Sequence, residues 1–404
     1  MCAKVVIIGH GYTSRLGIIR SLAELKCDIT VIAMVFNGAF GRFIRGEGGK
    51  PIDCCSKYVG RVLYCNVKDE DGLVKLLLDK CVDSDQKVIL IPDSDFSAAV
   101  IDKNSDCLKD HFVFPHIKNG AGTIRKWMDK TEQKDLARSM GMNVANGCVV
   151  SVNNGTYVFP KDVKYPCFTK ALATISGGKQ FLKRCDDENR LKIVLDTVAQ
   201  KYNTEVLIED FKQIDKEYAV VGFSDGENVV IPGIIRFIAN SSSHYGIARE
   251  GMIMPIDGFE PFIEKLETYV KTVGFIGLFD IDFYESEGEL FFSELNLRFG
   301  GSGYAYTKMG VSLPAMMINF FNGDSYLDMH RRIEGTATYI NERMCLDDYV
   351  TGYLTLNEFK RIVRTDCIRF IYDENDPGPQ RKFNRYLGFQ RVNRLRRKLR
   401  KLLK

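Results

Sequence analysis

The chain has 404 residues, of which 45% are hydrophobic and 27% are charged, with a formal net charge of +4. This balance predicts a globular protein of two or three lobes and excludes an intrinsically disordered chain. The sequence has no run of 18 apolar residues and no signal peptide, and its twelve cysteines and five histidines lack CxxC or zinc-ligand spacing. These features favour a cytoplasmic protein with reduced thiols.

Residues 1–115 alternate between apolar runs and helical stretches. The runs at 4–9, 28–34 and 87–93 predict buried strands, and residues 13–25 predict a helix. Such alternation is typical of an α/β domain built on a parallel sheet.

Two candidate sites follow strands of this domain. Gly9 and Gly11 begin a dinucleotide-binding pattern, but Ser14 stands where the third glycine belongs, so NAD binding is not favoured. Asp93 and Asp95 follow a strand at the edge where open α/β sheets bind ligands. Two interpretations of these acids stay open, namely substrate contact and a helix N-cap.

Residues 116–200 carry two lysines and a Gly-rich loop. Lys130 directly precedes a predicted helix at 131–140, and Lys170 ends a short β-like run. Two lysines that bracket a triphosphate supply the point charges that such an anion needs. The loop 174–179 (TISGGK) suits phosphates through its backbone N–H groups, although it is not a P-loop.

A predicted β-hairpin carries the most restrictive pattern in the chain. A three-residue loop at 287–289 pairs Asp282 with Glu294, and Asn296 shares the face of Glu294 because alternate residues of a strand point the same way. Two carboxylates and an amide suit a hard cation such as Mg²⁺, with Mn²⁺ as the alternative ion. Arg298 continues this face with a cationic fork suited to phosphate or carboxylate.

A polar loop follows the predicted strand before this hairpin. It carries Arg236, the serines 241–243, His244 and Arg249. Two interpretations stay open, because such a loop either lines the pocket for the acid or amine or is a flexible surface segment.

The end of the chain has two predicted parts. Residues 331–376 predict a β-rich appendage, with strands in the segments GTATYINE, TGYLTL and DCIRFIYD. Residues 381–404 hold eleven Lys and Arg and no acidic residue, which leaves −7 for residues 1–380.

Apolar residues recur in the tail at helical spacing, at Val392, Leu395, Leu399 and Leu402. A basic amphipathic helix is typical of contact with an anionic membrane surface, and a solvated, partly disordered end is the alternative. Nucleic acid is not expected as a partner, because the tail has few aromatic residues to stack on bases.

In this order, these motifs resemble the ATP-grasp superfamily. The resemblance implies an α/β ATP-grasp fold with an N-terminal Rossmann-like (pre-ATP-grasp) domain. The implied units are the pre-ATP-grasp domain 1–115, the small nucleotide lobe 116–200, the large lobe with the Mg²⁺ site 201–330, the β-rich appendage 331–376 and the basic tail 377–404.

The resemblance also implies roles for individual residues, with ATP and Mg²⁺ as cofactors. Nucleotide binding falls on Lys130, Lys170, Ser176, Gly177, Gly178, the adenine hinge Glu209, Asp210, Phe211 and Lys212, and the ribose-binding Glu217. The implied Mg²⁺ ligands are Asp282, Glu294 and Asn296. Asn296 and Arg298 are implied to act in catalysis. Substrate contacts are expected from Arg236, His244, Arg249, Gly301 and Ser302.

Among ATP-grasp enzymes, the chain to about residue 325 is similar to the carboxylate–amine ligases typified by D-aspartate ligase. The similar pieces are CSKYVGRV, VFPHI, QIDKEYAVVGF and SELNLRFGGSG. Two positions depart from the pattern, because Asp280 stands where many such ligases carry arginine, and Gly301 stands where the D-aspartate type carries arginine. D-Aspartate is therefore not assigned as the substrate.

The implied reaction joins a carboxylate to an amine through an acyl phosphate, with cell-envelope or polysaccharide precursors as one class of acceptor. Carbamoyl-phosphate or biotin-carboxylase chemistry and a non-catalytic nucleotide-binding relative stay open as alternatives. Small-molecule acids and amines are the expected partners, and the sequence leaves open a homodimer.

Overall fold

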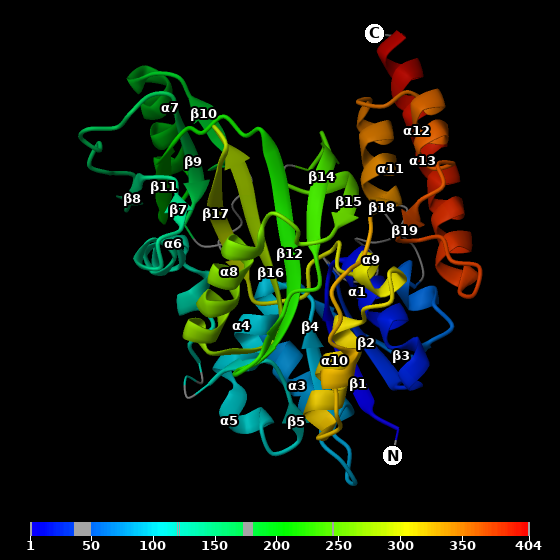
Figure 1. The fold of residues 1–404 in the computed structure, drawn as a ribbon. Helices are drawn as coiled ribbons and strands as arrows, with labels where there is room; N and C mark the ends of the chain where they lie inside the picture. Colours follow the sequence, from blue (N-terminus) through cyan, green and yellow to red (C-terminus); the bar gives the residue numbers. More distant parts are fainter. Residues whose placement is uncertain are drawn as a thin grey trace.

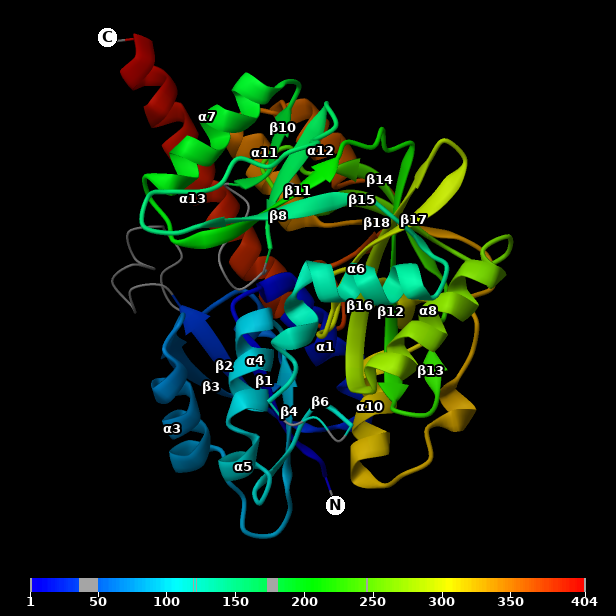
Figure 2. The same cartoon turned by 90° about the vertical axis from the view of Figure 1, so that its left-hand side faces the viewer.

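The computed structural model describes residues 2–35, 50–118, 120, 122–172, 181–244 and 246–402, and the side chains of residues 12 and 391–402 lie outside that description. Three β-sheets organise these residues. In Figure 1 the small sheet with helix α7 and the C-terminal helices α11–α13 lie on opposite sides of the large sheet. In Figure 2 the N-terminal domain lies below the small sheet and beside the lower part of the large sheet.

The N-terminal domain is an α/β unit whose strands are all parallel, as predicted. The sheet has the order β3-β2-β1-β4-β5. Its strands are β1 (Lys4–Gly9), β2 (Asp28–Val35), β3 (Val59–Asn66), β4 (Val88–Pro92) and β5 (Phe112–Val113). Its helices are α1 (Tyr12–Ser21), α3 (Glu70–Lys80), α4 (Asp95–Lys103) and α5 (Ser105–Leu108), with short 3₁₀ turns η1 (Ala23–Leu25) and η2 (Asp53–Cys55). The helix predicted at 13–25 is therefore α1 followed by η1.

A small antiparallel sheet forms a separate lobe. It contains β8 (Gly147–Val152), β9 (Cys167–Ala171), β10 (Lys183–Cys185) and β11 (Thr204–Asp210), in the order β10-β9-β11-β8. Helix α7 (Glu188–Ala199) covers it through a shared apolar cluster. The predicted boundary at residue 200 is wrong, because it cuts β11 from the sheet in which β11 is a central strand.

The large sheet joins segments from most of the chain. Its main path is β19-β18-β15-β14-β12-β16-β17-β7, and β13 pairs with β12 while β6 pairs with β16. The strands are β6 (His116–Ile117), β7 (Asn143–Val144), β12 (Lys216–Asp225), β13 (Val229–Val230), β14 (Ile234–Asn240), β15 (Ala248–Met254), β16 (Phe275–Ser286), β17 (Glu289–Asn296), β18 (Ala337–Ile340) and β19 (Ile368–Arg369).

The two faces of this sheet have different environments. Helices α6 (Lys130–Ser139) and α8 (Glu260–Val273) share one apolar cluster with alternate strand residues such as Val220 and Ile281. The neighbouring residues Ala219 and Asp282 lie on the other face. There, α9 (Tyr304–Lys308), α10 (Leu313–Asn322) and the N-terminal α1 share a second cluster, which leaves the end of that face near Asp282 for polar groups. Two further 3₁₀ turns are η3 (Lys126–Met128) and η6 (Leu327–Met329).

The predicted β-rich character of residues 331–376 is wrong. This segment has only the short strands β18 and β19, with helices α11 (Glu342–Thr351) and α12 (Leu356–Ile362) between them. Gly352 ends α11 in the left-handed conformation at φ 98°, and Thr355 begins α12 in a capping box with Glu358. The segment TGYLTL is thus a helix-to-helix connection.

The last helix, α13 (Pro377–Leu402), begins as a packed element. Its Phe383 is 3% exposed and belongs to an apolar cluster with Leu346 and Ile371. Just before α13, Asp376 accepts from Arg20 Nε at 3.0 Å, and both side chains are almost fully buried. The first half of the predicted basic tail is therefore part of the folded body.

Candidate functional site

The hairpin of β16 and β17 brings together the predicted cation ligands. Asp282 pairs directly with Glu294, as predicted, although the turn is different. The turn has two residues, Glu287 and Gly288, both with positive φ, and the ladder shifts by one residue at Ser293. The shorter turn and the extra residue offset each other, so the predicted pairing is confirmed.

Asp280 joins this group, which the sequence pattern did not indicate. It pairs with Asn296 one step along the ladder. Burial raises the pKa of Asp280 to about 6, with Glu294 and Asp95 adding to the shift and Arg298 opposing it. Burial, Asp280 and Glu294 likewise raise the pKa of Asp282 well above its usual range.

These carboxylates have the chemistry of a cation site. Burial is the largest cause of the raised pKa values of Asp280 and Asp282, and the neighbouring carboxylates add to it. Asp282, Glu294 and Asn296 offer hard oxygen ligands on one face of the hairpin, which fits Mg²⁺. Among the described residues, no group of three or more His, Cys, Asp or Glu side chains is arranged as a metal cage. The Mg²⁺ ligands that the protein offers here are therefore two carboxylates and one amide. So few protein ligands suit an ion whose other ligands are phosphate oxygens.

The two predicted lysines reach the site from different elements. Lys130 begins α6, and its Nζ lies 2.6 Å from Glu294 Oε1. Lys170 lies on β9 of the small sheet, and its Nζ lies 2.7 Å from Glu209 Oε2. Burial lowers the pKa of Lys170 to about 8. The lysines therefore border the acid cluster from two different elements.

Lys134 is a functional candidate that the sequence analysis missed. It lies one helical turn after Lys130 on α6, is 6% exposed and forms an ion pair with Glu209. Burial, followed by the charges of Lys170 and Lys130, lowers the pKa of Lys134. Lys134 follows Lys130 by four residues, so both lie on the same face of α6. This spacing is the feature of the sequence that could have identified Lys134.

The predicted adenine hinge lies at the end of β11. Glu209 itself is 3% exposed and turns its carboxylate to the two lysines. The amides of Asp210 and Phe211 donate to Asn146 O (2.8 Å) and Pro166 O (3.1 Å), whereas the amide of Lys212 has no partner within the described part of the chain.

Glu217 lies on β12 and accepts from Asn240 Nδ2 at the wall of the same cleft. The predicted loop residues Ser176, Gly177 and Gly178 lie outside the described residues.

Arg298 connects the hairpin to the N-terminal domain. Its Nε lies 3.0 Å from Asp95 Oδ1, and its Nη1 lies 3.9 Å from Asp280 Oδ2. Its Nη2 donates weakly to Asn296 Oδ1 at 3.4 Å. Asp95 is both the first residue of α4 and the partner of this arginine.

A cleft of about 1220 Å³ is lined by these groups, except for Lys134. It is lined by parts of each unit, including the N-terminal domain and the C-terminal helices. The lining residues that the sequence analysis did not anticipate include Asn341, Arg343, Asp347, Lys382 and Tyr386. They come from α11 and α13 or their junctions, so the C-terminal unit forms one wall of the cleft.

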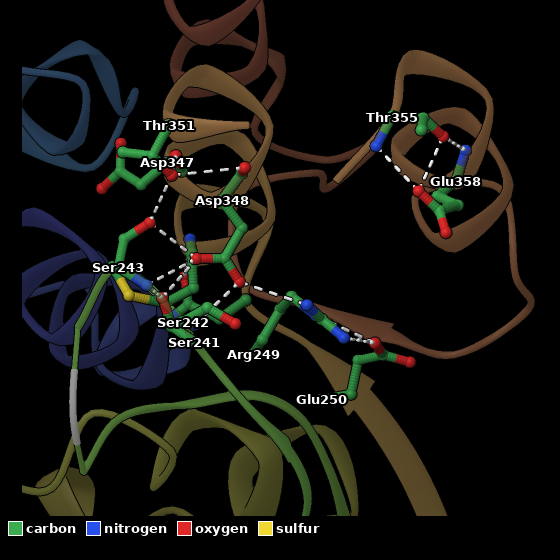
Figure 3. A network of polar contacts seen from close by, with 12 residues as sticks. Ser241, Ser242, Ser243, Arg249, Glu250, Asp347, Asp348, Thr351, Thr355 and Glu358 are labelled. Carbon is green, nitrogen blue, oxygen red and sulfur yellow. Dashed lines mark hydrogen bonds and ion pairs between the residues drawn. The ribbon is translucent and has the colours of Figure 1, made fainter. Parts of the chain in front are cut away.

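The polar loop at 241–243 is anchored to this wall. Asp348 of α11 accepts from Ser241 Oγ at 2.8 Å, from Ser243 Oγ at 2.7 Å and from Arg249 Nη1 at 3.1 Å (Figure 3). The amides of Ser242 and Ser243 donate to the same carboxylate. Ser241 lines the cleft, so the interpretation as a pocket-lining loop is favoured over a flexible one.

The remaining predicted substrate residues lie in different places. His244, Gly301 and Ser302 line the cleft, with His244 Nε2 3.0 Å from Asp347 Oδ2 and Ser302 Oγ 3.0 Å from the Tyr339 hydroxyl.

Two predicted residues lie outside the cleft lining. Arg249 pairs with Glu250 and Asp348, which makes it part of the loop anchor. Arg236 pairs in register with Tyr218, whose side chain lies on the α8 face, so Arg236 points away from the acid cluster.

The architecture is the α/β ATP-grasp fold that the sequence motifs indicated. The solved structures that support this include the L-amino acid ligase of Bacillus licheniformis, with a TM-score of 0.60, 15% identity and coverage of 83% of this chain and 79% of that one. They also include the N5-carboxyaminoimidazole synthetase of Staphylococcus aureus complexed with ADP, with a TM-score of 0.63, 17% identity and coverage of 89% and 86%. At these identities the likeness establishes the fold.

Curated relatives match over a smaller part. The carbamoyl phosphate synthase large chain of Gemmatimonas aurantiaca is 23% identical over 219 residues, which are 53% of this chain and 20% of that protein. That of Clostridium beijerinckii is 28% identical over 144 residues, 34% of this chain and 13% of that protein. The chain thus spans about a fifth or less of these relatives. No family model matches the sequence. Within the described residues, no helix is long and apolar enough to cross a membrane.

Proposed function

We propose that this protein is an ATP-dependent ligase that joins a carboxylate to an amine. The observation that carries the proposal is the convergence of two lysines, an arginine and the Asp282–Glu294–Asn296 set on one cleft. Phosphoryl transfer requires mainly positioning and charge neutralisation, and these groups supply both.

In the proposed reaction, a carboxylate oxygen of the acid attacks the γ-phosphorus of ATP, and the bond from this phosphorus to the bridging oxygen breaks to release ADP. The amine nitrogen then attacks the acyl carbon, and inorganic phosphate leaves with the C–O electron pair. Lys130, Lys170 and Arg298, which all line the cleft, would neutralise the phosphates. Asp282, Glu294 and Asn296 would hold Mg²⁺, which would offset the charge of the phosphate oxygens.

The nucleotide would bind between the small sheet and the hairpin. The amide of Lys212, which has no partner among the described residues, would donate to an adenine edge, and Glu217 would accept from ribose hydroxyls. Asn240, its present partner, is an uncharged donor of the same kind. The ion pairs Lys130–Glu294 and Lys170–Glu209 would loosen as the phosphates arrive, because the lysines would gain a stronger anionic partner.

The experiment is a screen of ADP release against carboxylates crossed with amino acids. ADP and phosphate should form in equal amounts only when an acid is present, and hydroxylamine should trap the activated acid as a hydroxamate. Acid-independent ATP turnover without a trapped adduct across the panel would contradict the proposal.

Bicarbonate is the second candidate acid. Two of the structural neighbours, the Staphylococcus aureus synthetase and the biotin carboxylase domain of Hydrogenobacter thermophilus bound to MgADP and bicarbonate, are carboxylating proteins by name. Bicarbonate therefore belongs in the acid panel. ADP release that depends on bicarbonate alone would replace the carboxylate–amine reaction by a carboxylation.

We propose in addition that the end of α13 contacts an anionic membrane surface. The helix continues to Leu402, and residues 391–404 hold eight Lys and Arg and no acidic residue. Such a segment would bring the enzyme close to a lipid-linked precursor.

A further inference from the structure

Asp93 is a buried carboxylate without a partner at the edge of the cleft. It follows β4 directly, and its amide donates to Ile8 O at 2.7 Å, which fixes its backbone beside β1. The side chain is 6% exposed and lines the cleft. Within the described residues, neither Oδ1 nor Oδ2 has a hydrogen-bond partner within 3.5 Å. Burial of a carboxylate in this state is unfavourable, and such groups are rare outside functional sites.

The cations near Asp93 are already engaged by other acids. Arg15 donates through Nε to Asp53 Oδ2 at 2.8 Å, and both side chains are almost fully buried. Arg298 pairs with Asp95 at 3.0 Å. Each cation therefore has its own anion, and Asp93 remains as an additional acid beside two completed ion pairs.

The electrostatic surroundings of Asp93 are consistent with this geometry. Burial raises the pKa of Asp93 to about 7, while Arg15, Ser14 and Arg298 oppose the shift and Asp53 adds to it. A positively charged ligand placed beside Asp93 would restore its ordinary acidity.

Two glycines shape the access to Asp93. A Cβ atom at Gly9 would lie 2.8 Å from Asp93 Cβ, so Gly9 permits the close approach of β1. A Cβ atom at Gly11 would lie 3.5 Å from Asp93 Oδ2, on the side of the cleft that Gly11 itself lines. The backbone of Gly11 is extended, with φ −85° and ψ 112°, which any residue can adopt. The missing side chain at Gly11 thus leaves room next to Oδ2.

We propose that Asp93 binds the ammonium group of the amine substrate in the ligase reaction. This inference rests on the proposed function and names the chemical class of its second substrate, a primary amine that arrives as a cation. An ammonium is compact and carries three donors, which suit two carboxylate oxygens without partners. A divalent metal would need further oxygen ligands, and the neighbouring Asp95 is committed to Arg298.

The position of Asp93 also suits the second step of the reaction. Its charge acts on Arg298, as do those of Asp280 and Asp282, so it lies on the N-terminal side of the phosphate-binding groups. An ammonium held there loses two protons as its nitrogen forms the amide bond, and both protons leave with the inorganic phosphate.

The test separates the two half-reactions in the full-length protein with Asp93→Asn. The acid is the one that gives the highest ADP release with wild type, and the amine is the best of the standard amino acids and ammonium chloride. Hydroxylamine serves as a probe that is uncharged at pH 7 and needs no carboxylate partner. The matched control is Asp69→Asn, an exposed N-cap of α3 in the same domain, which should leave both reactions unchanged.

Asp93→Asn should raise KM for the amine at least about tenfold, as expected for the loss of one charge-assisted contact. Hydroxamate formation should stay within about threefold of wild type. An unchanged KM for the amine overturns the inference, and so does an equal loss in both reactions. If wild type itself shows no acid-dependent ADP release, the proposed function fails first, and that result is visible without any variant.

Gly11→Ala provides a second variant that keeps the Asp93 charge. Its methyl group would occupy the space beside Oδ2, so KM for the amine should rise while hydroxamate formation persists. This variant decides the question if Asp93→Asn does not fold, and an unchanged KM for the amine then overturns the inference.

Discussion

Single side chains at the hairpin explain how a short segment of sequence specifies the candidate site. The pairing of Asp282 with Glu294 could be predicted because alternation along two strands and a Gly-containing turn restrict the register. Asp280 and Lys134 could not be assigned in the same way. Their role depends on burial beside residues distant in sequence, such as Arg298 and Glu209.

Replacement of Glu294 by glutamine tests the cation site. The variant keeps the shape of the side chain but removes the charge that faces Lys130 and the expected Mg²⁺. We expect at least about a 100-fold loss in kcat, equivalent to roughly 2.7 kcal/mol, with an unchanged melting temperature. Glu289→Gln, at the exposed start of the same strand, is the control. Normal turnover by a well-folded Glu294→Gln protein would place the metal elsewhere. Asn296→Ala should have a similar but smaller effect.

The acid cluster also predicts how Mg²⁺ stabilisation depends on pH. Asp280 has a folded-state pKa of about 6, above its ordinary value of 3.8. The folded state therefore holds more protons between these values, and its stability falls as pH rises through that range. Mg²⁺ would offset the repulsion that appears when Asp280 ionises. The increase in Tm caused by Mg²⁺ should thus be larger at pH 7.5 than at pH 5.

Thermal unfolding of wild type and Asp280→Asn at both pH values measures this effect. The variant cannot ionise at position 280, so its Mg²⁺-induced increase in Tm should depend less on pH. An increase that is the same at both pH values in wild type would show that Asp280 does not sense the ion.

At the scale of elements, continuous apolar runs were sufficient to predict β1, β2 and β4 of the N-terminal sheet, whereas β3 and β5 were not predicted. The C-terminal segment was misjudged because its apolar residues were given more weight than its helix signals. Gly352 and the Thr355–Glu358 capping box are local signals that were present in the sequence. The contact of α11 with the loop at 241–243 joins residues about a hundred positions apart, and no local pattern indicates it.

Replacement of Asp348 tests how much the contact between α11 and the loop at 241–243 contributes to stability. Burial alone would raise its pKa, but donors from Ser243, Ser241 and the loop backbone lower it below the usual range. Asp348→Asn replaces one acceptor by a donor that faces these hydroxyls and amides. We expect the free energy of unfolding to fall by about 3 kcal/mol at pH 7, measured by urea denaturation.

The same experiment has a pH signature. A carboxyl group whose pKa is lower in the folded state stabilises the protein at pH values above its unfolded-state pKa. This stabilisation is lost as pH falls through the folded-state pKa. The difference between wild type and Asp348→Asn should therefore shrink in acid. The control is Glu358→Gln, an exposed residue that keeps its capping role. A difference below about 0.5 kcal/mol at pH 7 would show that the loop does not depend on this anchor.

At the scale of the whole molecule, the N-terminal domain contacts the segment that precedes α13. Arg20 of α1 donates to Asp376 and to the carbonyl oxygens of Phe370 and Ile371. The N-terminal domain and the C-terminal helices therefore hold each other in place, and both line the cleft. The order of motifs could not predict this contact, because buried ion pairs between distant residues leave no periodic trace in a sequence.

The structure changes where the basic tail can be cut to test membrane contact. Removal of everything after Pro379 would delete Phe383 from its apolar cluster and Lys382 and Tyr386 from the cleft wall. A truncation after Gln390 keeps these residues and removes eight cations. Each cation near an anionic surface contributes about 1 kcal/mol, screened over ~8 Å at physiological salt.

Full-length protein should therefore sediment with phosphatidylserine-containing vesicles at low salt and be released at high salt, whereas the truncated protein should stay in the supernatant. Vesicles of phosphatidylcholine alone control for charge, and the ADP-release assay controls for an intact cleft. Equal sedimentation of both proteins, or of neither, would show that the tail does not bind the membrane.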